Sequence, residues 1–101
     1  MKVNIEYEKG RYDISPWWVT RVKNILLRRD IPTFITRGTV MYELTGEAKW
    51  GARWHKPNMR LQQQVTHILQ QLRVTKNGKR YRYVKDGQTQ YSGIRMVLVE
   101  E

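Results

Sequence analysis

The chain contains no cysteine, so it has no disulfide framework, no cysteine-type zinc site and no thiol nucleophile. It also lacks a long apolar run. The longest aliphatic stretch, Met96 to Val99, is far shorter than the roughly 20 apolar residues of a membrane helix. The segment from Met1 to Glu6 lacks the apolar stretch of a signal peptide. We therefore expect a soluble, cytoplasmic protein with no membrane partner.

Acidic residues are scarce, and they are unevenly placed. Nine Asp and Glu oppose 19 Lys and Arg, which gives a formal net charge of +10. Between Ala48 and Lys85 there are ten basic residues and no acid, whereas the rest of the chain carries nine of each sign. Such segregation creates a local positive field that attracts polyanions and releases counterions on contact with phosphates. Nucleic acid is therefore the expected partner, and a merely solvated basic face is the alternative.

The length of 101 residues predicts one domain over residues 1–101 and excludes a multidomain enzyme. Glu47-Ala48-Lys49 matches the acid-x-Lys fragment of a metal-dependent nuclease, to which Asp13 or Asp30 could add a carboxylate. The chain is too short, however, for both a nuclease sheet and the helices inferred below. His55 and His67 have no acidic or thiol companion nearby in sequence. We therefore expect no catalytic activity, no metal site and no cofactor.

The first part of the chain predicts a ribbon and a helix. Val3 to Tyr7 alternates apolar and polar residues, and Arg11 to Ile14 is expected to pair with it as a short N-terminal β-ribbon. Ser15 and Pro16 are typical of an N-cap and a first helical position, so a helix is expected to begin there. The residues of this helix expected in the core are Trp17, Trp18, Val22, Ile25 and Leu26.

A second, shorter helix is expected after a break. Pro32 ends the first helix because a proline disfavours helical geometry at the preceding residue. Thr33 to Ile35 is β-prone, and Thr36 is a candidate N-cap of a helix that stops before Gly46. Glu47 to Lys56 fits no apolar period and is expected to be a loop. The inward positions of the second helix are Val40, Met41 and Leu44.

The third helix has the clearest pattern in the chain. It is expected to begin near Asn58, and its apolar residues recur at helical spacing: Leu61, Val65, Ile68, Leu69 and Leu72. The opposite face carries amide, hydroxyl, imidazole and guanidinium groups and no carboxylate. This polar face is formed by Gln63, Thr66, His67 and Gln70, with Arg60 and Arg73 at its borders.

Two turn signals follow the third helix. Asn77-Gly78 is the strongest short hairpin signal, and Asp86-Gly87 is a second candidate. The longer strands are expected at Arg80 to Val84 and at Tyr91 to Val99. Three helices followed by a basic β-hairpin predict an α+β fold of the winged-helix type, a helix-turn-helix variant. The cations of this wing are Lys76, Lys79, Arg80, Arg82 and Lys85.

This arrangement suits duplex DNA. A helix fits the major groove, where Gln bridges adenine and Arg bridges guanine through paired hydrogen bonds. The wing cations are expected to meet phosphates or a minor groove beside that helix. A neutral, solvated helix face is the alternative for the glutamines, and cross-strand packing is the alternative for Tyr81 and Tyr83. The residues placed to read base edges are Arg60, Gln63, His67 and Gln70.

A family resemblance lies in the run from Phe34 to Glu43 (FITRGTVMYE), in Asn58, and in Val65 through Leu69 to Leu72-Arg73. These residues resemble the winged-helix module of Dam-replacing restriction endonucleases over about Ser15 to Val84. In that family the module binds duplex DNA through its third helix and wing. Because no nuclease core precedes the module here, the resemblance does not imply cleavage. It does imply DNA-contacting roles for Arg60, Gln63, His67, Gln70 and Arg82.

Three functional hypotheses remain open. The first is sequence-directed duplex DNA binding by a small transcription regulator of bacterial or phage-like type. The second is an interaction or inhibitor protein whose basic face docks on an acidic protein surface. The third is RNA binding through aromatic stacking, although core packing is the alternative for the tryptophans. The aromatic residues of the third hypothesis are Tyr81, Tyr83, Trp50 and Trp54. The oligomeric state and the target sequence are not fixed by the sequence.

Overall fold

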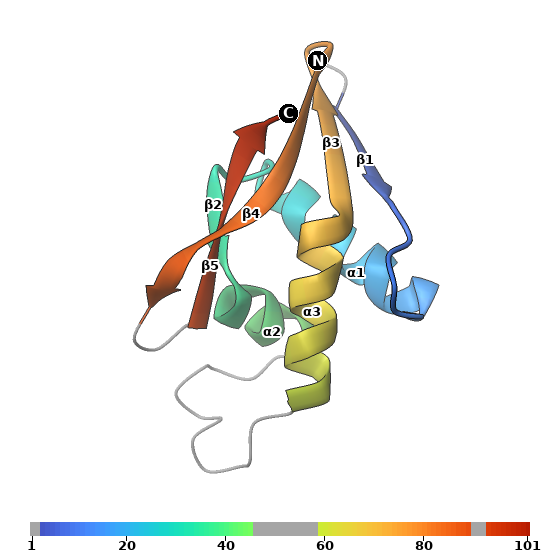
Figure 1. The fold of residues 1–101 in the computed structure, drawn as a ribbon, viewed down its shortest axis with the longest axis vertical. Coiled ribbons are helices and arrows are strands. Elements are labelled where there is room, and N and C mark those ends of the chain that lie inside the picture. Colours follow the sequence, from blue (N-terminus) through green and yellow to red (C-terminus); the bar gives the residue numbers. More distant parts are fainter. Residues whose placement is uncertain (1–2, 46–58, 90–92) are drawn as a thin grey trace.

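The fold combines three helices with one curled antiparallel sheet in the residues that the computed structural model describes, 3–45, 59–89 and 93–101. The five strands are ordered β1-β3-β4-β5-β2 across the sheet (Figure 1). This is the expected α+β class. None of the described helices is long and apolar enough to cross a membrane. The elements are β1 (Val3–Tyr7), α1 (Pro16–Arg28), β2 (Phe34–Thr36), α2 (Arg37–Thr45), α3 (Met59–Gln71), β3 (Leu72–Lys76), β4 (Lys79–Thr89) and β5 (Gly93–Glu100).

Helix α1 begins where the Ser-Pro pair predicts. The Ser15 hydroxyl accepts a hydrogen bond from the Trp17 backbone N–H at 3.3 Å, and Pro16 is the first helical residue. Trp17 itself is 57% exposed because it lies outside the apolar stripe, so the expectation that it belongs to the core is wrong. Trp18 is partly buried against the core. The fully buried side of α1 consists of Val19, Val22, Ile25 and Leu26.

The connection from α1 to α2 also follows the local signals. The Ile31 backbone N–H donates to the Leu26 carbonyl at 2.8 Å and so closes the end of α1. The short β-prone segment forms β2, and the Thr36 hydroxyl accepts a hydrogen bond from the Thr39 backbone N–H at the start of α2. The second helix is therefore confirmed. Its inward side chains are Val40 and Leu44, which are buried, and Met41, which is partly buried.

Helix α3 buries its apolar stripe and then passes directly into a strand. Gln71 ends the helix and Leu72 begins β3 with no intervening loop (Figure 1). The sequence pattern carries the helix on to Arg73, because an apolar residue at 72 also fits the helical period. In the structure Leu72 belongs to β3, and its side chain enters the core from that strand. The predicted stripe is confirmed by the burial of Leu61, Val65, Ile68, Leu69 and Leu72.

Strands β3 and β4 form the hairpin that Asn77-Gly78 predicts, and the φ values of these two residues are 55° and 79°. The second predicted turn, at Asp86-Gly87, is wrong. Strand β4 continues to Thr89, and an irregularity in the pairing between Lys85 and Gln88 accommodates the positive φ of the glycine. The β4–β5 hairpin is therefore longer than expected, and its end projects away from α3 (Figure 1).

The N-terminal ribbon that the alternation predicts is not formed. Strand β1 pairs antiparallel with β3, which places Ile5 opposite Val74. Both side chains are buried, whereas residues 11–14 form no strand. The alternation predicts β1 itself, and that strand is confirmed. The predicted partner is wrong, because burial against the core favours the distant strand β3 over the nearest β-prone segment.

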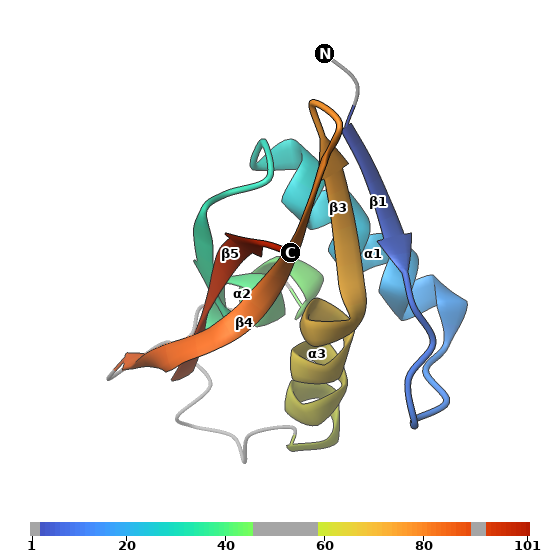
Figure 2. The same cartoon turned by 45° about the horizontal axis from the view of Figure 1, so that its top comes forward.

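The helices α1 and α2 cover one face of the sheet (Figure 2). Tyr83 of β4 belongs to the buried core. Its hydroxyl donates a hydrogen bond to the Pro32 carbonyl at 2.6 Å. Burial raises the pKa of the Tyr83 phenol, so this hydroxyl stays a donor. Cross-strand packing is thus the role of Tyr83, and Tyr81 is partly buried against the same core. The predicted loop at 47–56, with Trp50 and Trp54, lies outside the described residues.

Candidate nucleic-acid interface

A groove of about 560 Å³ runs along the outward face of α3. One wall is formed by residues 12–14 of the strap, which we define as residues 8–14 between β1 and α1. The other wall combines Lys85 of β4, Ile94 of β5 and Arg37, the first residue of α2. The groove therefore brings together segments from four places in the sequence. Its floor on α3 is formed by Arg60, Gln63, Gln64, Thr66, His67 and Gln70.

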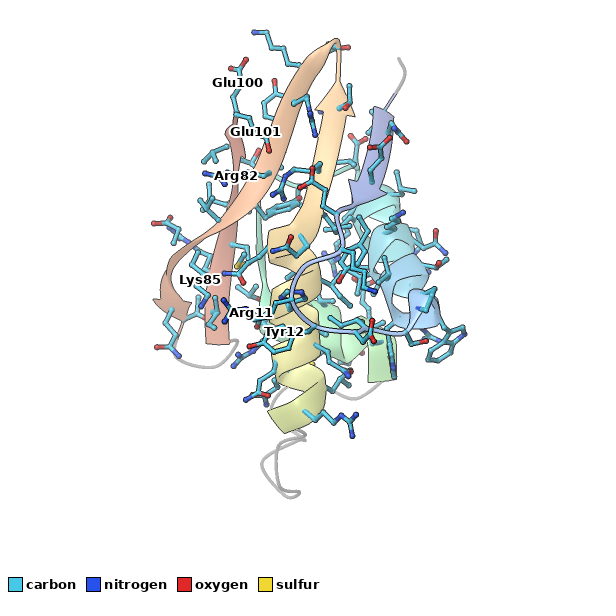
Figure 3. All side chains as sticks on the ribbon, turned by 45° about the vertical axis from the view of Figure 1, so that its right-hand side comes forward. Arg11, Tyr12, Arg82, Lys85, Glu100 and Glu101 are labelled. Atoms are coloured by element: carbon cyan, nitrogen blue, oxygen red, sulfur yellow. The ribbon has the colours of Figure 1, made fainter. Side chains whose placement is uncertain are left out.

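The strap is held against the C-terminal half of α3. The Glu8 backbone N–H donates to the Gln71 carbonyl at 2.9 Å. Gly10 lies so close that a Cβ there would stand 2.7 Å from Cε1 and 2.8 Å from Nε2 of His67. The Tyr12 ring meets the His67 ring edge-on, with centroids 4.9 Å apart. Figure 3 shows Tyr12 lying across the front of α3, so part of the polar face of this helix is covered by the chain itself.

His67 is therefore not an open base-reading residue, contrary to the sequence expectation. Its Nε2 atom is buried and has no hydrogen-bond partner among the described residues. Burial lowers the pKa of His67 below its ordinary value of 6.5, because the protonated ring would lose solvation. The ring is thus neutral at pH 7. It lies beneath the strap as a packing surface.

The lowered pKa of His67 predicts a pH-dependent stability. The unfolded chain binds a proton near the ordinary pKa of 6.5, whereas the folded chain binds it only at lower pH. The free energy of unfolding should therefore be highest above pH 6.5 and fall below it, by less than about 1.4 kcal/mol per pH unit. Urea unfolding between pH 7.5 and 5.5 measures this slope. We expect His67→Gln to reduce it; a variant that keeps the full slope would contradict the assignment.

The close approach of Gly10 to His67 gives a second prediction. Gly10→Ala places a methyl group against the imidazole ring and should lower the free energy of unfolding by about 1–3 kcal/mol, the usual cost of overpacking. In the His67→Ala background the ring is absent, so the same substitution should cost much less. Thermal unfolding of the four proteins in this cycle measures the coupling. Additive effects would show that the two residues do not press on each other.

Three cations line the groove. Arg60 lies on the floor, and Arg37 and Lys85 lie on the wall opposite the strap. None of them forms an ion pair with a carboxylate of the described residues. The acid that lines the groove, Asp13, is 3.1 Å from the Lys9 ammonium group. The local field in the groove is therefore positive.

Arg73 and Arg80, two predicted contact residues, are engaged elsewhere. Arg73 Nε lies 2.9 Å from Glu101, and its Nη2 lies 3.3 Å from Glu8, with its side chain only 15% exposed. The Arg80 guanidinium lies 3.7 Å from each of the same two carboxylates. Their charge is largely balanced within this four-residue cluster. We therefore leave both arginines out of the proposed interface.

The remaining predicted wing cations lie away from the groove. Lys76 and Lys79 flank the Asn77-Gly78 turn, which is at the opposite end of the molecule from the start of α3 (Figure 1). The 13 residues of α3 and the five of β3 separate that turn from Arg60 by about 35 Å along the chain. Arg82 is exposed but neighbours the buried Tyr83, so it points to the other face of β4.

Of the six predicted contact residues between Arg60 and Arg73, four therefore remain together and accessible. Gln63 and Arg60 are exposed, and Gln70 is partly exposed. The Thr66 hydroxyl donates to the Gln62 carbonyl at 3.0 Å, which leaves its oxygen free to accept. The sequence predicts Lys85 on a wing formed by the Asn77-Gly78 hairpin. In the structure Lys85 lies on β4 and lines the groove. Tyr12 and Arg37 were missed, because only the crossing of the strap and the pairing of β2 with β5 bring them to the groove. The four predicted residues that remain accessible in the groove are Arg60, Gln63, Thr66 and Gln70.

No protein family matches the chain, and no curated protein and no solved structure is significantly similar to it. The described residues contain no group of three or more His, Cys, Asp or Glu side chains that could hold a metal ion. The geometry and charge of the groove are therefore the features that indicate a function.

Proposed function

We propose that the protein binds duplex DNA as a winged-helix module. Helices α1, α2 and α3 precede the long β4–β5 hairpin, and β2, which lies between α1 and α2, pairs with β5. In this assignment the wing is the β4–β5 hairpin, whose Lys85 lines the groove on α3, and β1 and β3 are additions to the module. The chain connectivity and the place of Lys85 support the proposal.

The observation that carries the proposal is the charge in the groove on α3. Arg37, Arg60 and Lys85 come from three different elements and surround the groove without an ion-pair partner among the described residues. Unbalanced cations at one site are costly unless an anion is bound there, because they repel one another. A phosphate backbone supplies several such anions at regular spacing.

The proposed contact uses the N-terminal half of α3. In helix-turn-helix proteins the N-terminal residues of the recognition helix contact base edges, and the positive end of the helix dipole favours phosphates there. Arg60 and the exposed Gln63 belong to this half. Lys85 of the wing would then meet the backbone. The strap covers the C-terminal half, so the helix enters the major groove by its end and not along its side.

Fluorescence anisotropy with a labelled duplex tests the proposal directly. We expect saturable binding whose affinity falls steeply between 50 and 200 mM salt, because bound phosphates release counterions. Selection from a random duplex library should then enrich particular sequences. Equal affinity for every duplex and for heparin would contradict sequence-directed binding. A duplex-binding module of this size acts by occupying its site, so regulation of transcription is the role we propose.

Gln63→Ala should relax sequence preference without abolishing binding. A glutamine that forms two hydrogen bonds with adenine contributes about 1–3 kcal/mol of discrimination against other bases. The substitution should therefore reduce the affinity for the selected sequence and leave the affinity for unrelated sequences almost unchanged. Competition titrations measure both. An equal loss on all sequences would place Gln63 outside the major groove.

A protein partner is the alternative that the same charge would permit. A pull-down from nuclease-treated lysate distinguishes it, because recovery of one acidic protein without nucleic acid would favour an inhibitor or interaction protein. Recovery that disappears after nuclease treatment would favour the DNA proposal.

A further inference from the structure

The groove on α3 has the size of a small-ligand site. Its volume of about 560 Å³ falls within the range of roughly 300–1,000 Å³ typical of ligand pockets. It has a wall on each side of the helix. A single nucleotide that has left the stack can enter such a space. The groove therefore offers room for something narrower than a duplex.

The strap wall provides an aromatic surface. The Tyr12 ring is 57% exposed and lines the groove. Its edge contact with the His67 ring, which is itself packed beneath Gly10, holds it in place. Every nucleobase has a flat face that can stack on such a ring, and this favours a base outside the duplex stack, because a base within the stack has both faces covered by its neighbours. Ile14 on the same wall and Ile94 opposite add apolar surface.

The rest of the groove matches the other parts of a nucleotide. The floor carries the amides of Gln63, Gln64 and Gln70, which both donate and accept hydrogen bonds, as base edges do. The guanidinium of Arg37 and the ammonium of Lys85 lie on the wall opposite Tyr12. Cations of this kind bind phosphate. Aromatic, amide and cationic groups thus line one groove.

We propose that this groove binds one unpaired nucleotide, with its base against Tyr12 and its phosphate at Arg37 and Lys85. The inference rests on the proposed DNA binding and adds its ligand: a duplex with one nucleotide outside the stack. An acidic peptide would satisfy the two cations, but it would leave the stacking surface and the glutamine amides without matching groups. The nucleotide uses all three.

The experiment compares two duplexes of the same sequence that carry 2-aminopurine at one central position. In one the base is paired with thymine, and in the other it faces an abasic site and is unpaired. We expect the unpaired duplex to bind about tenfold more tightly, in line with the stacking of one base on an aromatic side chain. The 2-aminopurine fluorescence should change on binding, because the base moves from the DNA stack to the Tyr12 ring.

Two variants identify the aromatic surface. Tyr12→Ala should reduce the preference for the unpaired duplex to within about twofold, whereas Tyr12→Phe should retain it, because phenylalanine stacks equally well. Tyr42→Ala is the matched control, since Tyr42 is also an exposed tyrosine (46%) but lies on α2 and does not line the groove. It should leave the affinity for both duplexes unchanged. A preference that survives Tyr12→Ala would overturn the proposal.

The remaining outcomes separate this inference from the proposed function. Salt-dependent binding with equal affinity for both duplexes would retain DNA binding and overturn the nucleotide site. Binding to neither duplex would overturn both. Competition by free deoxyadenosine monophosphate at millimolar concentration would support the groove as a site for a nucleotide that need not belong to a chain. Competition by poly-glutamate as effective as that by the unpaired duplex would instead overturn the proposal in favour of an acidic peptide.

Discussion

Replacing Arg60 and Lys85 together with glutamate is expected to lower the affinity for duplex DNA about 100-fold at low salt, or about 2.8 kcal/mol. The two side chains line the same groove from α3 and β4 and have no ion-pair partner among the described residues. Each replacement removes one phosphate contact and adds a carboxylate that repels the backbone. The slope of log affinity against log salt should fall by about two ions.

The matched control is the pair Lys76→Glu and Lys79→Glu, at the Asn77-Gly78 turn. It changes the net charge by the same amount, and the two residues are directly opposite each other in the hairpin, so one like-charged pair replaces another. We expect a loss of less than about fivefold, because only the long-range field changes. Anisotropy titrations at 50 mM salt compare the two variants. A larger loss for the lysine pair would identify the β3–β4 hairpin as the wing, as the sequence first indicated.

Tyr83→Ala is expected to lower the free energy of unfolding by about 3–5 kcal/mol, the usual cost of deleting a buried aromatic ring. Tyr83 is 1% exposed and joins β4 to the segment before β2 through its hydrogen bond to the Pro32 carbonyl. Small domains are stable by only about 5–15 kcal/mol, so this variant should lose a large part of its stability. Urea unfolding measures the loss.

Two further variants separate the ring of Tyr83 from its hydroxyl group. Tyr83→Phe should cost about 1 kcal/mol, a decrease of roughly 4–8 °C in Tm, because it removes one hydrogen bond and keeps the ring. Tyr81→Ala, two residues earlier on the same strand, should cost less than Tyr83→Ala, since Tyr81 is only partly buried. Equal losses for the two alanine variants would mean that Tyr83 is no more central to the core than its neighbour.

Local signals in the sequence were sufficient for the helices. The Ser15-Pro16 start of α1, the Thr36 hydroxyl at α2 and the apolar stripe of α3 all depend on residues within one or two turns of each other. Such signals act in the same way in any fold. The Asn77-Gly78 hairpin belongs to the same class, because both residues readily adopt positive φ.

Strand partners and the walls of the groove could not be predicted in this way. Strand β1 pairs with β3 across more than 60 residues of sequence, and residues 11–14 are left to cross α3. The Asp86-Gly87 pair has turn chemistry, but pairing with β5 holds it within a strand. Arg37 reaches the groove because β2 pairs with β5. Each of these outcomes depends on contacts between distant segments, which composition and spacing do not encode.

The direct passage of α3 into β3 makes the two elements one mechanical unit. Gln71 and Leu72 are consecutive and belong to a helix and a strand, so no flexible linker separates them. A tilt of α3 on bound DNA would therefore move β3 with it. The strand β1, which is paired with β3, and the Asn77-Gly78 turn would move with β3. A spectroscopic label at the tip, far from any contact with the ligand, would report this rotation.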